Sequence, residues 1–401
     1  MKLTPEEMGM MEGDQGLGVA KAMEIVVALG RIYDAECLVP VTSVQVAGVS
    51  YRNLGEAGLA FLREWADQGA QARVPATLNP AGIDLQAWKA LGFSEDFAHR
   101  QGLVVEAYER LGVRPTCTCT PYLVGNKPAL GEHVAWAESS AVSYANSVLG
   151  ARTNREGGPS ALAAAIIGRT AAYGLHLDEA RRASLKVDVH CPVHTTADFG
   201  ALGYLVGKRA QNRVPYFSGL ERPDKADLKA LGAAMAASGA VALYHVEGVT
   251  PEADRPHILT SNPETFVVDD LTPAYAALNA DAGDIDLVWF GCPHASVAEI
   301  ERVARLLRGR RVTSALWVTT SRDVYQQAAQ KGWVRAIEES GGRVVADMCV
   351  VVAPMQELDY RTMATPSAKG ATYAPSHAGL LVRYGPVGQC IEAAVTGRWP
   401  S

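Results

Sequence analysis

The spacing of apolar residues predicts a chain in which helices and strands alternate. Thr4-Pro5-Glu6-Glu7 combines an N-cap Thr, a Pro at the first position and a Glu where a capping box needs one, which is typical of a helix start. A mostly buried helix is expected from about Val19 to Tyr33, where apolar side chains recur at helical spacing. The other elements expected in the first half are strands at 38–46 and 73–78, and helices at 55–68, 84–91, 93–111 and 160–173.

The second half alternates more clearly between apolar strands and helices. Strands are expected at 241–246, 285–290, 311–319 and 343–346, with helices at 297–307 and 323–339. This alternation is typical of a parallel sheet covered on both faces, so the predicted fold class is α/β. The turn-forming run Gly219–Asp224 is placed at a weakly marked boundary, which gives expected domains at 1–219 and 220–401.

Length and charge narrow the classes of function. A chain of 401 residues suits two to three domains with a sizeable core. The net charge of −6 comes without a dense basic block, which argues against a nucleic-acid partner or an anionic membrane surface. No apolar run reaches the ~18 residues that a membrane span needs, and no signal-peptide core follows the N-terminus. We therefore expect a cytoplasmic protein.

Seven cysteines, an odd number in a chain without an export signal, argue against a disulfide framework. Cys292 lies just past the expected strand at 285–290, and Cys349 just past the one at 343–346. The carboxyl ends of parallel strands lie at one edge of a sheet, which is where ligands bind. Both cysteines are therefore predicted to share that edge of one sheet.

Cys119, in a polar Thr-Cys-Thr-Pro-Tyr loop, could join these two cysteines. Three thiolates from separate loops can hold an iron–sulfur cluster, and a four-iron cluster would then keep one iron free to act as a Lewis acid. Scattered single cysteines are also common as buried small hydrophobic residues, and spacing alone favours that simpler interpretation.

Other candidates have equally simple alternatives. His190, Cys191 and His194 with Asp188 have the residue types of a zinc site, although no second ligand pair is apparent. Lys369 suits an anionic substrate group but could be a solvated surface residue. Glu138-Ser139-Ser140 could be no more than a helix N-cap.

Several common motifs are missing from the chain. Gly13–Gly18 has the wrong glycine spacing and no preceding strand for a dinucleotide fingerprint, so a helix entry is the better interpretation. The P-loop, His-Glu-x-x-His and Gly-x-Ser-x-Gly patterns do not occur, which removes the usual signs of kinase-like enzymes, zinc proteases and α/β-hydrolases.

Several stretches together resemble the large subunit of the aconitase X family, over essentially the whole chain. The run from Glu138 to Glu156 is the longest and most specific. The matching stretches are Gln45–Tyr51, Thr77–Gly82, Thr118–Tyr122, Glu138–Val142, Tyr144–Glu156, Phe199–Gly203, Gly291–His294, Ser367–Lys369 and Ile391–Trp399. The resemblance implies an aconitase-like fold of parallel-sheet α/β/α domains, with the cluster site at the carboxyl ends of strands.

The resemblance also implies a ligand set and a substrate site. Cys119, Cys292 and Cys349 match the family's three cluster ligands, and the Thr-Pro-Tyr that follows Cys119 favours it over the neighbouring Cys117. A [4Fe-4S] cluster with one iron not bound by a protein thiolate is expected, although three thiolates could also hold two or three irons. The positions that match the family's substrate site are Gly48, Val49, Ser50, Asn79, Pro80, Glu138, Ser139 and Lys369.

The implied reaction is dehydration of a β-hydroxy acid. Gly48–Tyr51 and Asn79-Pro80 look like the type that dehydrates (R)-5-phosphomevalonate to trans-anhydromevalonate 5-phosphate in a modified mevalonate route to isoprenoids; the alternative is cis-3-hydroxy-L-proline dehydratase. No catalytic base is assigned in this chain, because the resemblance implies a small swivelling-domain subunit that supplies it. A zinc hydrolase built on His190, Cys191, His194 and His294, or a non-catalytic binding module, stays open as a different class.

Overall fold

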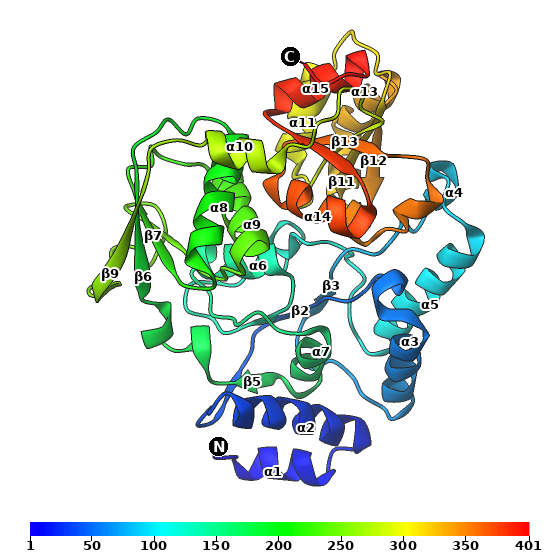
Figure 1. The fold of residues 1–401 in the computed structure, drawn as a ribbon. Coiled ribbons are helices and arrows are strands. Elements are labelled where there is room, and N and C mark those ends of the chain that lie inside the picture. Colours follow the sequence, from blue (N-terminus) through cyan, green and yellow to red (C-terminus); the bar gives the residue numbers. More distant parts are fainter. Residues whose placement is uncertain (401) are drawn as a thin grey trace.

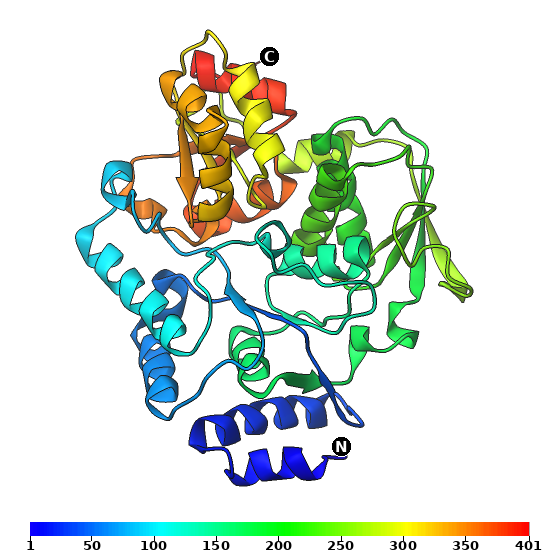
Figure 2. The ribbon, with the colours of Figure 1, turned by 180° about the vertical axis from the view of Figure 1, so that it is seen from behind.

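Three lobes, each built on its own parallel sheet, surround a common centre (Figure 1). The structure is a computed structural model, and it describes residues 1–400. The view from behind shows the same three lobes, with the N-terminal helices at the far end from the C-terminus (Figure 2). Throughout the described chain, the helices are too short or too polar to traverse a lipid bilayer.

The N-terminal lobe begins with two packed helices, α1 (Pro5–Glu12) and α2 (Leu17–Ile32). The predicted capping box is confirmed, since the Glu7 amide donates to the Thr4 hydroxyl and the Thr4 amide donates to the Glu7 carboxylate. The glycine-rich segment between the helices is a helix entry, as expected. Gly16 is the N-cap of α2 with φ near +98°, a conformation that favours glycine.

The sheet of this lobe has the order β3-β2-β4, and all its strands are parallel. Its strands are β2 (Val44–Val46), β3 (Ala76–Leu78) and β4 (Ala135–Trp136). The remaining helices of the lobe are α3 (Tyr51–Asp67), α4 (Trp88–Leu91), α5 (Glu95–Arg110), α6 (Ser139–Tyr144) and α7 (Gly158–Ile167). A separate antiparallel pair joins β1 (Leu38–Pro40) to β5 (Arg169–Ala171).

Several expected elements of this lobe are wrong in extent; the strand at 73–78 begins at Ala76, and the helix at 55–68 begins at Tyr51. The strand at 38–46 is two strands, because Pro40 has no N–H for a ladder and the two pieces pair with different partners. The helix at 160–173 ends at Ile167, since Gly168 adopts a left-handed φ of +70° and β5 follows. The helix at 84–91 is only the single turn α4.

The middle lobe has a parallel sheet in the order β8-β7-β6-β9. Its strands are β6 (Ala183–Val189), β7 (Pro215–Ser218), β8 (His245–Val246) and β9 (Leu259–Val268). Figure 1 shows α8 (Thr196–Ala210) and α9 (Lys225–Gly239) between this sheet and the C-terminal lobe, with α10 (Thr272–Leu278) above them.

Two features predicted from the sequence, a strand and a domain boundary, lie in the middle lobe. The strand at 241–246 is reduced to β8, and it pairs with β7 of this sheet instead of joining the C-terminal strands. Residues 219–224 form the loop between β7 and α9. The division into domains at 219 and 220 stays a prediction.

The C-terminal lobe has five parallel strands in the order β12-β11-β10-β13-β14. They are β10 (Leu287–Phe290), β11 (Ala315–Thr320), β12 (Arg343–Ala346), β13 (Thr362–Thr365) and β14 (Leu381–Tyr384). The helices are α11 (Val297–Leu306), α12 (Arg322–Gln330), α13 (Trp333–Glu339), α14 (Ala368–Ala378) and α15 (Val387–Thr396). The single helix expected at 323–339 is two helices, because Gly332, at φ +79°, interrupts it.

Both faces of the five-stranded sheet are buried. In β10, Leu287 and Trp289 pack into one core, whereas Val288 and Phe290 pack into another. Successive strand residues point to opposite faces, so a strand buried on both sides is apolar throughout. The predicted α/β fold class with parallel sheets is confirmed.

Candidate active site

The carboxyl ends of strands from two sheets meet around one cavity of about 380 Å³. The segments that follow β2, β3 and β4 form one side, and those that follow β10, β12 and β13 form the other. Ligands of parallel sheets bind at such ends, and here two of them face each other. The expected site residues on the cavity wall are Asn79, Pro80, Cys119, Glu138, Ser139, Cys292, Cys349 and Lys369.

The three candidate cysteines reach this cavity from three separate segments. Cys292 follows the last residue of β10 by two positions, and Cys349 follows that of β12 by three. Both strands pair in parallel with β11, so the predicted shared sheet edge is confirmed. Cys119 comes from the other sheet, where the Thr118 amide donates to the carbonyl at the end of β3.

The surroundings of the three thiols differ. The closeness of the Cys292 and Cys349 thiols lowers the pKa of Cys292 and raises that of Cys349 well above its usual value. The nearby Ser367 side chain also lowers the pKa of Cys292. Burial, with the nearby charge of Glu138, raises the pKa of Cys119 to about 12.

Cys117 lies elsewhere. Its side chain is fully buried in the hydrophobic core of the N-terminal lobe, the same cluster that contains Ala81 and Val113. Burial raises the pKa of the Cys117 thiol far above its usual value. Cys119 lines the cavity two residues further on, at 6% exposure.

Lys369 and Glu138 form a buried ion pair across the two sides of the cavity. The Lys369 ammonium also donates to the Ser140 hydroxyl at 3.1 Å. Burial opposes the charged form of both groups, but each partner outweighs it: the net pKa of Glu138 is lowered and that of Lys369 is raised. Lys369 is thus no solvated surface residue, and the alternative stated for it is wrong.

The N-cap interpretation of Glu138 is confirmed, although it is incomplete. Its carboxylate accepts from the Ala141 amide at 2.7 Å and caps α6. The same carboxylate accepts from the Ser140 hydroxyl at 2.6 Å and pairs with Lys369. One side chain therefore joins the helix start to the cavity wall.

Asn79, on the wall of the same cavity, has an unsatisfied acceptor. Its Oδ1 atom is buried and has no hydrogen-bond partner among residues 1–400. Buried polar atoms without a partner are costly and rare, which makes such an atom on a cavity wall suited to a ligand or water donor. Asn79 follows directly after β3.

The segment Gly48–Ser50 lies beside the cavity rather than on its wall. The Val49 side chain packs into the core, and the Ser50 hydroxyl donates to the Val352 carbonyl at 2.7 Å. The segment runs between Ala47 and Asn53, which both line the cavity. The substrate-binding role expected for Gly48, Val49 and Ser50 stays a prediction, as does that of the other site residues.

Sequence reasoning missed several cavity residues, including Asn53, Tyr373 and His377. Arg155 is the most informative, because its side chain is exposed and makes no ion pair or side-chain hydrogen bond within residues 1–400. It lies in the polar, loop-rich stretch 115–160, whose composition is typical of a functional segment but does not single out Arg155.

A second missed residue is Gln45, which connects the two halves of one cavity wall. Its amide nitrogen donates to the Thr118 carbonyl at 3.0 Å, and its amide oxygen accepts from the Glu138 backbone at 3.2 Å. A polar residue between Val44 and Val46 in a fully buried strand is the sequence pattern that could have revealed it.

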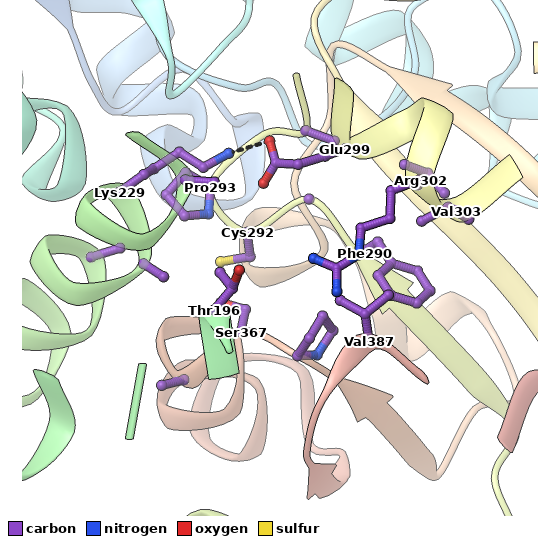
Figure 3. Close-up of a pocket in the computed structure, with 18 residues that line it drawn as sticks. Thr196, Lys229, Phe290, Cys292, Pro293, Glu299, Arg302, Val303, Ser367 and Val387 are labelled. Atoms are coloured by element: carbon purple, nitrogen blue, oxygen red, sulfur yellow. Dashed lines mark hydrogen bonds and ion pairs between the residues drawn. The ribbon is translucent and has the colours of Figure 1, made fainter. Parts of the chain in front are cut away.

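A smaller cavity of about 100 Å³ lies on another side of Cys292 (Figure 3). Figure 3 shows Cys292 between Thr196 and Ser367 on one side and the pair of Lys229 and Glu299 on the other. The Lys229 ammonium and the Glu299 carboxylate are 2.6 Å apart. The Cys292 loop therefore packs against the middle lobe through α9.

The zinc site considered at 188–194 is not formed. His190, Cys191 and His194 lie after β6 with His190 and His194 exposed, and no group of three His, Cys, Asp or Glu side chains in residues 1–400 is placed to hold one metal ion. His294 is fully buried, and both its ring nitrogens are already bonded within the fold. The zinc alternative is therefore wrong.

The donor set at the main cavity fits an iron–sulfur cluster. A cluster binds each thiolate to a different iron, so its cysteines need not converge on a single point. Three soft sulfur donors on separate loops, with no fourth cysteine on this wall in the described chain, match a cluster held by three protein ligands.

Comparisons with known proteins agree along the whole chain. Family models match residues 1–179 (aconitase X first domain), 183–275 (second domain) and 285–396 (third domain). These three ranges coincide with the three lobes. The crystal structure of Thermococcus kodakaraensis aconitase X in its holo-form has a TM-score of 0.92 and 48% identity, over 98% of this chain and 100% of that one.

The curated relatives that match most of this chain include proteins of two names. The phosphomevalonate dehydratase large subunit of Methanothermobacter thermautotrophicus is 53% identical, over 94% of this chain and 95% of its own. That of Methanocaldococcus jannaschii is 44% identical, over 98% and 100%. The cis-3-hydroxy-L-proline dehydratase of Pseudomonas aeruginosa is 36% identical, and the match covers 100% of this chain but 71% of that protein.

Proposed function

The chain is a member of the aconitase X family, and we propose that it is the large subunit of a two-subunit hydro-lyase that dehydrates (R)-5-phosphomevalonate to trans-anhydromevalonate 5-phosphate. The observation that carries the proposal is the convergence of three cysteines, the Lys369–Glu138 pair and the open acceptor of Asn79 on one cavity. The higher identity to phosphomevalonate dehydratase large subunits favours this substrate over cis-3-hydroxy-L-proline.

Cys119, Cys292 and Cys349 would hold the cluster, which we propose to be [4Fe-4S] with one iron lacking a protein thiolate. When bound, the cluster supplies a Lewis-acidic iron for the departure of the substrate hydroxyl, which is a poor leaving group by itself. Loss of that hydroxyl and of the proton on the carbon next to the carboxylate gives an alkene and water.

The chain's own residues would bind and orient the substrate. Asn79 Oδ1 is free to accept from a substrate hydroxyl, and the Lys369 ammonium, kept charged by Glu138, attracts an anionic group. Arg155 adds an unpaired guanidinium at the exposed side of the cavity, suited to a second anionic group such as a phosphate. A substrate with a carboxylate and a phosphate matches these two cations.

A small partner subunit would complete the site with the proton-abstracting base. The cavity is partly open to solvent, and the printed name of the relatives, large subunit, implies a smaller companion. The hydroxyproline dehydratase has a part of its length without a counterpart here, which is consistent with one family fusing what the other keeps as two chains.

The test is to purify this chain without oxygen, measure iron and acid-labile sulfide, and assay dehydration with and without the small subunit encoded in the same organism. We expect iron and sulfide together, and water loss from (R)-5-phosphomevalonate only when both subunits are present. Preferential turnover of cis-3-hydroxy-L-proline, or full activity of this chain alone, would contradict the proposal.

A further inference from the structure

One imidazole touches the neighbours of all three cysteines. His294 lies two residues after Cys292 and is fully buried. Its Nε2 atom is 2.8 Å from the carbonyl oxygen of Met348, the residue before Cys349. Its Nδ1 atom is 2.9 Å from the hydroxyl of Thr118, the residue before Cys119.

The hydrogen-bond partners of His294 determine which of its ring nitrogens carries the proton. A backbone carbonyl only accepts, so Nε2 carries the proton and donates to Met348; Nδ1 then accepts from the Thr118 hydroxyl. The Thr118 oxygen in turn accepts from the Thr120 amide at 3.2 Å. Each group is satisfied, which makes the arrangement rigid.

The backbone of His294 also makes hydrogen bonds to neighbouring segments. Its amide donates to the Cys119 sulfur at 3.2 Å, and its carbonyl accepts from the Lys229 ammonium at 3.3 Å. Figure 3 shows that ammonium paired with Glu299, next to the Cys292 loop. The loop is thereby held from outside by α9 and α11, while its inner side contacts the other two cysteine segments.

We infer that His294 is a positioning residue, whose imidazole holds the three cysteine segments at fixed places relative to one another before the cluster binds. The three ligands are far apart in the sequence, so no local constraint sets their spacing. Preordered ligands reduce the ordering cost of binding, and hydrogen bonds to a ligand sulfur tune a cluster's reduction potential. This inference rests on the cluster in the proposed function.

His245 provides a matched control in the same chain. It is also fully buried, and its Nε2 atom is 2.9 Å from the Arg181 carbonyl, but within residues 1–400 its ring makes no hydrogen bond to a cysteine segment. Replacing either histidine with Leu keeps much of the volume and removes the ring's hydrogen bonds. A purely structural role for His294 predicts the same outcome for both variants.

The experiment compares wild type, His294→Leu, His294→Gln and His245→Leu by hydrogen–deuterium exchange of the cluster-free chain. We expect His294→Leu to speed exchange in all three segments 117–120, 292–295 and 347–350. His294→Gln should restore part of the protection near 347–350, because its amide can still donate toward Met348. His245→Leu should leave all three segments as in wild type.

A second readout uses the cluster-loaded chain. His294→Leu should release iron to a chelator roughly 10- to 100-fold faster than wild type, the usual cost of losing a group that orients metal ligands. If His294→Leu does not fold, Thr118→Val carries the test, with faster exchange confined to 117–120 and faster iron release. Equal behaviour of the His294→Leu and His245→Leu variants in both measurements would overturn the inference.

Failure of the inference is distinguishable from failure of the proposed function. A wild-type chain that binds no iron and sulfide contradicts the proposed function. A wild-type chain that binds them, combined with a His294→Leu variant that retains them equally well, contradicts only the positioning role.

Discussion

Two sheet edges in this molecule, each at the carboxyl ends of parallel strands, carry cysteine, histidine and acidic side chains. One of them lines a cavity, whereas the other is exposed to solvent. At the paired edge, the segments after β2, β3 and β4 face those after β10, β12 and β13 around one cavity. At the open edge, formed by residues 188–194, 218–224 and 269–270 at the ends of β6, β7 and β9 and just beyond them, His190 and Asp269 are 3.3 Å apart with 61% and 73% of their side chains exposed.

The two edges carry similar residue types and differ in how deeply these side chains are buried. Lys369 and Glu138 at the paired edge keep only 9% and 7% of their side chains exposed. Removed from water, such groups interact strongly and must be satisfied by one another or by a ligand. At these two edges, ligand-type side chains are buried around a cavity only where a second sheet edge faces the first.

Cysteine replacement should give the largest contrast between the two edges. Cys292→Ser is expected to abolish iron and sulfide binding and to lower dehydration by about 10³-fold or more, since a metal's electrophilic assistance is worth several kcal/mol. Cys191→Ser at the open edge should leave both unchanged. Metal analysis and a dehydration assay decide this, and iron loss in Cys191→Ser would break the comparison.

Removing one charge of an ion pair should lower the free energy of unfolding much more at the paired edge than at the open edge. Lys369→Met leaves the Glu138 carboxylate buried without its partner, at an expected cost of about 3–5 kcal/mol in the free energy of unfolding. Lys186→Met in β6, just before the open edge, should cost about 0–1 kcal/mol, because Lys186 and Asp188 are 2.9 Å apart and partly exposed. Urea unfolding measures both, and equal costs would contradict the role given to burial.

Arginine replacement tests substrate binding without disturbing the fold. Arg155→Ala should raise the KM for (R)-5-phosphomevalonate roughly 10- to 100-fold, because a charge-assisted hydrogen bond contributes about 1.5–3 kcal/mol. Arg222→Ala, an exposed arginine at the open edge, is the control and should leave KM unchanged. An unchanged KM in Arg155→Ala would remove Arg155 from the substrate site.

A buried histidine pair predicts a smaller effect that depends on pH. His133 and His176 bring their Nδ1 atoms within 2.9 Å, and burial, with the charges of His133, Arg181 and Arg152, lowers the pKa of His176 to about 3. The folded pKa lies below the unfolded value near 6.5, so this contribution to stability is complete above pH 6.5 and is lost as pH falls toward 3.

The expected slope from this one group is at most about 1.4 kcal/mol per pH unit. His176→Gln cannot take up the proton, so its unfolding free energy should fall less steeply than that of wild type between pH 6 and pH 4, as measured by urea unfolding. Identical slopes for the two proteins would show that His176 does not titrate on unfolding.

Part of the site was predictable because strand ends are visible in the sequence. Cys292 and Cys349 follow apolar runs, which placed both at one sheet edge from pattern alone. Cys119 follows no such run, and only the resemblance to a family selected it over Cys117. Arg155 was missed because a lone exposed arginine in a polar loop has no pattern that distinguishes a cavity wall from any other surface. Gln45 could have been found from its position between two apolar strand residues, but its partners Thr118 and Glu138 are distant in the sequence.

The sequence by itself determined the start of α1, the parallel strands of the C-terminal sheet that follow its apolar runs, and the family, because capping, apolar runs and long matching stretches are local properties. Only the tertiary structure decided which edges face each other, and with that which thiols share a cavity and which charges lose their water. The pairing of Lys369 with Glu138 and the contacts of His294 with Thr118 and Met348 join residues distant in the chain. Such contacts depend on how the lobes pack, which no local pattern encodes.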